Sequence, residues 1–301
     1  MEIPVCPQCG RLMAEEAGPL CEKCEPAPVA AEAPGPWVTW TLVVVTAVAS
    51  AVGLGFSREQ FPLGAKFGPG IAGGEWWRLV TAFFVHNSLG HFVWNMIPLG
   101  FLGGRLERNL GHCVFLAFYL TCGITGSVVS LIAAPEQVAC GASGAVFGVC
   151  AGLFVFYLLR VRTLSRKRRI RLVALGIYIW TSFWPGFADL RVDNACHIGG
   201  LTAGAILGCV LSLGSRRKRL VQLVTFGAAA AMLAAGAFEF RQHNLYLVHL
   251  DAAARAIQNG KMDLAAAELR TAQAMKPDSP IGQFLQQKLD SADRPEPPDL
   301  P

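Results

Sequence analysis

The stretch Gly141-Ala-Ser-Gly-Ala-Val-Phe-Gly-Val-Cys-Ala-Gly152 opens an apolar segment with a serine set between glycines. Its glycines recur every four residues and so share one face of a helix: Gly144, Gly148 and Gly152. A second apolar segment, opened by Ala195-Cys196-His197, repeats this spacing at Gly200, Gly204 and Gly208. Such stripes of small residues allow two helices to approach closely in lipid. The pattern predicts that these helices pack together, with Ser143 and His197 at similar depth.

Ser143 and His197 are residue types that form nucleophile–base pairs. Taken alone, each has a structural alternative, a helix-packing serine and a hydrogen-bonded histidine. Polar groups at membrane depth are costly, and these two stand at matched ends of matching stripes, which favours the functional interpretation. Gly141 and Gly144 leave room for a substrate backbone, and a helix that starts here aims its first N–H groups at a developing oxyanion.

The composition indicates that much of the chain is solvated by lipid. Of its 301 residues, 53% are hydrophobic and 16% are charged, against about 25% charged in soluble domains. The sequence predicts an all-α polytopic membrane protein with a six-helix core (37–213) and a seventh span within 214–239. The seven predicted spans are Trp37–Phe56, Gly90–Leu106, Cys113–Ala133, Gly141–Val161, Leu172–Phe187, Ala195–Leu213 and Leu220–Phe238.

Two basic blocks, within 160–171 and 216–219, lie between predicted spans. A nucleic-acid interface is one interpretation of such blocks, but their position favours loops that obey the positive-inside rule, and no nucleic-acid partner is expected. Both loops fall on one side of the membrane if there are seven spans, which predicts a cytoplasmic N-terminus and a C-terminus outside. A transporter or channel would carry ionisable residues in several spans, and these spans have almost none outside the proposed site.

The N-terminal segment 1–25 carries two CxxC pairs: Cys6, Cys9, Cys21 and Cys24. Four thiolates complete a tetrahedral zinc shell and leave no open position, so we expect a structural zinc ribbon and no cofactor for catalysis. A disulfide pair and a redox CxxC are the alternatives, which a cytosolic location disfavours. The Pro- and Ala-rich residues 26–36 are expected to form a linker.

The C-terminal residues 240–290 are polar again and predict a helical hairpin, with helices at Leu245–Gln258 and Asp263–Met275. The hairpin is close to a single tetratricopeptide-like unit, and a plain helical hairpin is the alternative. Residues 291–301 are expected to be disordered. Protein partners for the ribbon and the hairpin are left open by the sequence.

In several of its motifs, the chain resembles the rhomboid family of intramembrane serine proteases. The family's GxSG motif stands at Gly141–Gly144, and its histidine motif runs from His197 to Gly204, with Cys196 where the family usually has alanine. The segment Glu75–His86 resembles the WR-containing first loop. The HxxxN element is matched by His91–Met96, and Gly103–Glu107 resembles the cytoplasmic end of the same span. The resemblance covers residues 37–213, without the ribbon or the hairpin.

The resemblance implies that Ser143 attacks a scissile carbonyl after His197 takes its proton. His91 and Asn95, one helical turn apart, would complete an oxyanion hole with the Ser143 N–H; an interhelical hydrogen-bonding pair is the alternative. Phe147 would stack on the imidazole ring of the base. Asp193 is expected to be solvated or to start a helix, so that the serine and histidine form a dyad without a carboxylate.

The expected substrates are single-pass membrane proteins, cut near the outer membrane face where a helix can unwind. We expect an integral protein of a bacterial cytoplasmic membrane, in contact with lipid. The alternative is a rhomboid-like pseudoprotease that binds membrane proteins without cleaving them.

Overall fold

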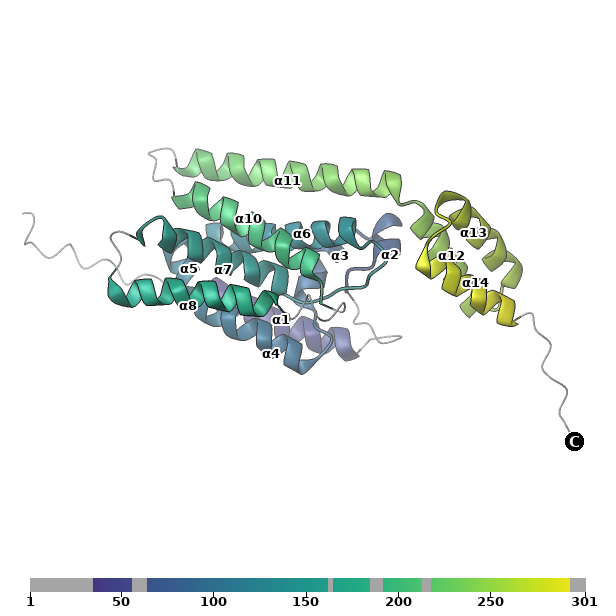
Figure 1. The fold of residues 1–301 in the computed structure, drawn as a ribbon, viewed down its shortest axis with the longest axis horizontal. Coiled ribbons are helices and arrows are strands. Elements are labelled where there is room, and N and C mark those ends of the chain that lie inside the picture. The colour runs from purple at the N-terminus through teal and green to yellow at the C-terminus, as the bar shows by residue number, and fades with distance from the viewer. Residues whose placement is uncertain (1–34, 56–63, 162–164, 185–191, 213–217, 293–301) are drawn as a thin grey trace, which may run out of the picture. The chain divides into compact units, whose positions relative to one another are not determined.

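The computed structural model describes residues 35–55, 64–161, 165–184, 192–212 and 218–292. From Pro36 onward they belong to one compact unit, Pro36–Pro301. These residues form helices and loops, with one isolated antiparallel bridge between Lys66 and Ala139 (Figure 1). The predicted zinc ribbon, 1–25, lies outside the described residues.

Three helices form the centre of the fold: α6 (His112–Ala133), α7 (Ser143–Leu158) and α10 (Asn194–Ser212). Helix α10 packs against both α7 and α6 (Figure 1). Phe118, Tyr119 and Cys122 of α6 are fully buried in the core beside these helices.

The two glycine stripes interlock, as the sequence predicted. A Cβ atom added at Gly200 would lie 1.9 Å from the carbonyl oxygen of Gly144. One turn further, a Cβ at Gly204 would lie 2.1 Å from the Gly148 oxygen. Because no side chain fits between the backbones, the glycines set both the separation and the register of α7 and α10.

Helix α1 (Trp37–Gly55) is anchored at its start by a buried carboxylate from another helix. Glu107 is 1% exposed and accepts hydrogen bonds from the backbone N–H groups of Val38 (2.9 Å) and Thr39 (2.8 Å) and from the Thr39 hydroxyl (2.6 Å). The first N–H groups of a helix have no partner within the helix, so Glu107 supplies one.

The second predicted span is built from three consecutive pieces: α4 (Leu89–Pro98), the π-helical turn η2 (Leu99–Gly103) and α5 (Gly104–Leu110). Pro98 lacks a backbone N–H, so the regular hydrogen-bond ladder is interrupted where the π-turn begins. Three short helices precede α4 in the chain: α2 (Gly68–Ala72), α3 (Arg78–Thr81) and η1 (Ala82–Phe84).

By length and composition, α6 and α10 are the described helices that could cross a membrane on their own, while Trp37–Gly53 and α7 are apolar but shorter. The predicted count of seven spans stays a prediction. Exposed apolar side chains on three helices suit contact with lipid: Trp37 and Val44 of α1, Trp94 and Ile97 of α4, and Val173 and Trp180 of α8 (Arg166–Phe183).

Two predicted boundaries are corrected by helices that begin within or next to the basic blocks. Helix α8 (Arg166–Phe183) begins inside the first basic block, which the sequence analysis assigned to a loop. Arg and Lys have high helix propensity, so the block continues the apolar helix instead of ending it. Helix α11 (Lys218–His243) extends the predicted seventh span at both ends.

The C-terminal hairpin prediction is wrong in the number of helices. Helices α12 (Tyr246–Gln258) and α13 (Met262–Met275) match the predicted pair, with Gly260 at a φ of +71° in the turn between them. A third helix, α14 (Pro280–Ala292), packs on both. Its Ile281, Leu285 and Leu289 follow a spacing of four and cover apolar surface that two helices leave open.

Candidate active site

The loop before α7 adopts a conformation that only glycine accommodates. Gly141 has a φ of +125°, and a Cβ added there would lie 2.5 Å from Cε1 of His91. Its N–H donates to the Ala82 carbonyl oxygen at 2.9 Å. Ser143 then becomes the first residue of α7, where backbone N–H groups have no partner within the helix.

His197 lies in the first turn of α10, is 7% exposed and reaches the serine. Its Nε2 atom is 2.8 Å from the Ser143 hydroxyl oxygen. This distance is within the range for proton transfer from a nucleophile to a base. Residues 54 positions apart are therefore brought together by the interlocked glycines of α7 and α10.

Two aromatic rings hold the imidazole of His197. Phe147, one turn after Ser143, stacks on it with ring centroids 4.5 Å apart and an interplanar angle of 25°. Phe183 of α8 lies 6.4 Å from the same ring in a tilted arrangement. The stacking of Phe147 was expected from the sequence, whereas the contact of Phe183 was not, since no motif links α8 to the histidine.

Among the described residues, Nδ1 of His197 has no hydrogen-bond partner. Asp193 is the carboxylate closest in sequence, and both of its oxygens are engaged elsewhere. One accepts from the Cys196 N–H at 3.0 Å, and the other accepts from the Ser130 hydroxyl. Asp193 therefore caps the start of helix α10, which was one of the two roles expected for it. It is half-buried, so the other expected role, a solvated residue, does not describe it.

His91 and Asn95 lie one helical turn apart on α4, and His91 reaches the nucleophile loop, residues 139–142, which leads into α7. The His91 ring approaches Gly141 and contacts the Asn87 amide oxygen through Nδ1 at 3.0 Å. The Asn95 side-chain amide donates to the His91 carbonyl oxygen at 2.9 Å, which leaves one amide hydrogen for another acceptor. Asn95 is 4% exposed, so its amide is fixed in place.

His86 is a residue of this site that the sequence analysis left as a structural hydrogen-bonding group. It is fully buried, and its Nε2 accepts the backbone N–H of Ala142 at 3.2 Å. Nδ1 must then carry the proton, which it donates to the Ser50 hydroxyl at 3.1 Å. Burial, aided by the nearby His91, lowers the pKa of His86 to about 3, so this loop histidine stays neutral.

A cavity of about 20 Å³ lies behind the serine, which is room for about one water molecule. Its lining includes residues from four parts of the fold, among them Lys66, Ser127, Ser130, Gly141, Ser143 and Asp193.

The predicted zinc ligands Cys6, Cys9, Cys21 and Cys24 lie outside the described residues. Within the described ranges, no group of three or more His, Cys, Asp or Glu side chains is arranged to hold a metal ion.

Comparison with known proteins identifies the family. A family model for the Rhomboid domain matches residues 73–214. The chain is 39% identical over 172 residues to "Rhomboid protease GluP" of Bacillus subtilis (strain 168), covering 56% of this chain and 33% of that protein. It is 38% identical over 142 residues to "RHOMBOID-like protein 5" of Arabidopsis thaliana, covering 46% and 45%. The chain thus spans between a third and a half of the length of these two relatives.

A shorter relative is matched over most of its length. The chain is 32% identical over 143 residues to "Putative rhomboid protease YdcA" of Bacillus subtilis (strain 168), covering 46% of this chain and 68% of that protein. The residues matched by the Rhomboid family model, 73–214, include the serine, the histidine and both glycine stripes described above. The chain belongs to the rhomboid family of integral membrane proteins.

Proposed function

We propose that this protein is an intramembrane serine endopeptidase. The observation that carries the proposal is the 2.8 Å contact between the Ser143 hydroxyl and Nε2 of His197, at the head of two interlocked helices. Relatives named rhomboid proteases support it. A part-buried hydrogen-bonded pair of this type, with a ring stacked on the base, is an arrangement that activates a serine.

In the proposed reaction, Nε2 of His197 takes the hydroxyl proton as Ser143 attacks the scissile carbonyl carbon. The protonated imidazole then gives that proton to the leaving amine, and an acyl-enzyme remains on Ser143. A water molecule, deprotonated by His197, hydrolyses the ester and restores the serine. The stacked Phe147 ring keeps the imidazole oriented through both steps.

The oxyanion is proposed to be held by the backbone N–H of Ser143 with His91 and Asn95. In support, the Ser143 N–H opens α7, the His91 ring lies against Gly141, and the buried Asn95 amide keeps one hydrogen for another acceptor. Loss of one such donor typically slows acyl transfer about 10²–10³-fold.

We propose single-pass membrane proteins as substrates, cut near the outer membrane face. The basic blocks support a cytoplasmic N-terminus and a C-terminus outside, in a bacterial cytoplasmic membrane. Ser143 and His197 each begin a helix that would run inward from that face. A peptide bond must leave its helix to be attacked, because a helical backbone is hydrogen-bonded and shielded.

The test uses the purified full chain in lipid vesicles with a model single-pass substrate. We expect Ser143→Ala and His197→Ala to lose at least about 10⁴-fold in cleavage rate, because members of a catalytic unit fail together. Ser212→Ala, the same chemical change at the far end of α10, is the matched control and should cleave normally. Cleavage that persists in Ser143→Ala would refute the proposal, and substrate binding without cleavage by the wild type would support the pseudoprotease.

We also propose that Cys6, Cys9, Cys21 and Cys24 hold one structural zinc ion. Two CxxC pairs support a closed tetrahedral site. Metal analysis of the full chain should find about one zinc per chain, and a Cys6→Ser/Cys9→Ser variant should lose it while Cys113→Ser keeps it. A wild-type chain that purifies without zinc would contradict the ribbon.

A further inference from the structure

Lys66 is a lysine whose ammonium group is buried beside the nucleophile loop. The residue is 1% exposed, and Nζ donates to the Ser130 hydroxyl at 2.6 Å and to the Ala134 carbonyl oxygen at 3.3 Å. Burial lowers the pKa of this loop lysine, and the nearby Asp193 carboxylate opposes that shift. A buried ammonium is costly, so its retention at this position calls for a partner and a role.

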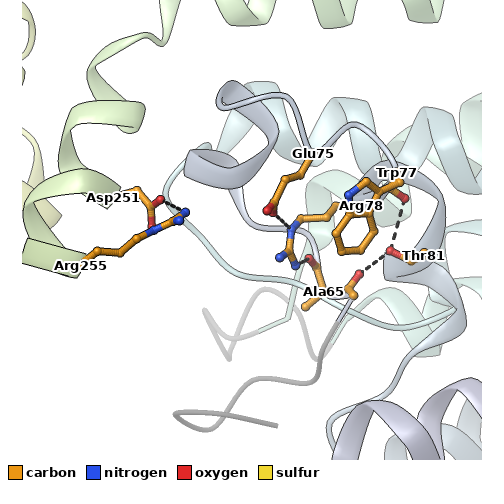
Figure 2. A network of polar contacts seen from close by, with 8 residues as sticks. Ala65, Glu75, Trp77, Arg78, Thr81, Asp251 and Arg255 are labelled. Atoms are coloured by element: carbon orange, nitrogen blue, oxygen red, sulfur yellow. Dashed lines mark hydrogen bonds and ion pairs between the residues drawn. The ribbon is translucent and has the colours of Figure 1, made fainter. Parts of the chain in front are cut away.

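The segment that carries Lys66 is clamped by the first loop of the domain. Figure 2 shows the Arg78 guanidinium between the Glu75 carboxylate and the carbonyl oxygen of Ala65, which it reaches at 3.0 Å. The Thr81 hydroxyl donates to the Gly64 carbonyl oxygen at 2.8 Å. These bonds fix the backbone on the N-terminal side of Lys66, so its side chain enters the interior in one direction.

The backbone of Lys66 is paired with the strand-like segment that leads to the serine. Its N–H donates to the Ala139 carbonyl oxygen at 2.7 Å, and the Ala139 N–H donates back at 3.2 Å. The chain then passes through Gly141 to Ser143. A displacement of Lys66 therefore moves the nucleophile loop directly.

The side chain of Lys66 is linked to the start of the histidine helix. Ser130, which accepts from Nζ, donates to one Asp193 oxygen, and the other Asp193 oxygen accepts the Cys196 N–H. His197 is the next residue, and its own N–H donates to the Asp193 carbonyl oxygen at 3.2 Å. Lys66, Ser130 and Asp193 also line the small cavity that reaches Ser143.

We infer that Lys66, Ser130 and Asp193 form a positioning unit that sets His197 relative to Ser143. The inference rests on the proposed protease function and deepens it. Lys66 contacts the segment before Ser143 through its backbone, and it is linked to the segment before His197 through its side chain. A buried ammonium and a half-buried carboxylate bridged by a hydroxyl hold one geometry, which a methyl contact would not.

The experiment separates positioning from simple charge compensation. Variants Lys66→Met, Asp193→Asn and the double variant are compared in the full chain in vesicles. Three quantities are measured: the rate at which a fluorophosphonate labels Ser143, kcat and KM on the model substrate, and resistance to unfolding by SDS. Thr125→Val, which removes a hydroxyl that bonds only its own helix among the described contacts, is the matched control.

Each single variant should lower kcat and the labelling rate about 10–100-fold with KM little changed, because misplacement of reacting groups by about 1 Å has effects of that order. The double variant leaves no unpaired charge, so it should regain SDS resistance while labelling stays slow. If Lys66→Met does not purify folded, Ser130→Ala, which keeps both charges, should show the same slow labelling.

Labelling that recovers together with SDS resistance in the double variant would overturn the inference, since the unit would then be structural. Normal labelling in Lys66→Met would overturn it as well. A wild-type chain that neither labels nor cleaves would instead overturn the proposed function, and the inference with it.

Discussion

The interlock of α7 and α10 predicts a graded response to alanine along one stripe. We consider three single variants on α10: Gly200→Ala, Gly204→Ala and Gly208→Ala. The added Cβ would lie 1.9 Å from the Gly144 carbonyl oxygen in the first and 2.1 Å from the Gly148 oxygen in the second. In the third it would lie 2.9 Å from the Gly152 Cα atom. All three obstacles are backbone atoms, which cannot rotate away.

The magnitude follows from the shortfall in distance. Ordinary contacts of a Cβ atom begin at about 3.4 Å, so the helices must separate by about 1.5 Å at Gly200 and by about 0.5 Å at Gly208. Gly200 lies less than one turn after His197. A separation of that size would stretch the 2.8 Å contact between Ser143 and His197 beyond hydrogen-bond reach.

We therefore expect Gly200→Ala to lose roughly 10²-fold or more in cleavage rate, as displacements near 1 Å do at active sites. Overpacking should also lower the free energy of unfolding by about 1–3 kcal/mol. Gly204→Ala should be nearly as severe, and Gly208→Ala much milder in rate, because its smaller shift lies three turns from the histidine.

The assay measures cleavage of the model substrate and fluorophosphonate labelling of Ser143, together with SDS resistance for each variant. Gly208→Ala serves as the matched control for helix propensity, since its chemical change is the same as in the other two variants. Equal rates for Gly200→Ala and Gly208→Ala would refute the reasoning that backbone contact sets the geometry of the pair.

Three further predictions concern groups that hold the site and the fold. The pKa of His86 is about 3 against about 6.5 when unfolded, so below pH 6.5 the unfolded chain binds a proton that the folded chain does not. Protonation of this group should lower the free energy of unfolding of the wild type by about 2 kcal/mol between pH 7.5 and pH 5. SDS titrations of His86→Gln at both pH values should lack this contribution. An equal pH dependence of stability in the wild type and the variant would contradict the prediction. Phe147→Leu keeps an apolar side chain but loses the flat face on His197, so kcat should fall about 2–12-fold at constant KM, and an unchanged kcat would argue against orientation by stacking. Glu107→Ala leaves the first N–H groups of α1 without their carboxylate and should lower the free energy of unfolding by about 2–4 kcal/mol. Glu107→Gln should have a smaller effect. Equal stability of the two variants would contradict a role for the acceptor oxygens.

The periodic features of the chain were predictable because each depends on local spacing. Glycines every four residues on two apolar segments predict two faces of close approach, and the helices meet in the predicted register. The stacking of Phe147 follows from the same logic, since it lies one turn from Ser143. The third C-terminal helix carried a readable signal as well, in the spacing of Ile281, Leu285 and Leu289, but its Pro- and Gln-containing sequence masked it.

Periodicity and composition were enough to predict the two glycine-striped helices, their faces of close approach and the residue types that can carry acyl-transfer chemistry. The tertiary structure alone decided how the loops serve those residues. Lys66 reads in the sequence as one more loop lysine, yet it is buried and donates to Ser130, 64 residues away. Ser130 in turn donates to Asp193, a further 63 residues along the chain. His86 likewise makes a distant contact, since it accepts the N–H of Ala142, the residue before the serine, across 56 residues of chain. Such contacts have no period in the sequence, since they arise only when packed helices bring distant loops to one end of the fold.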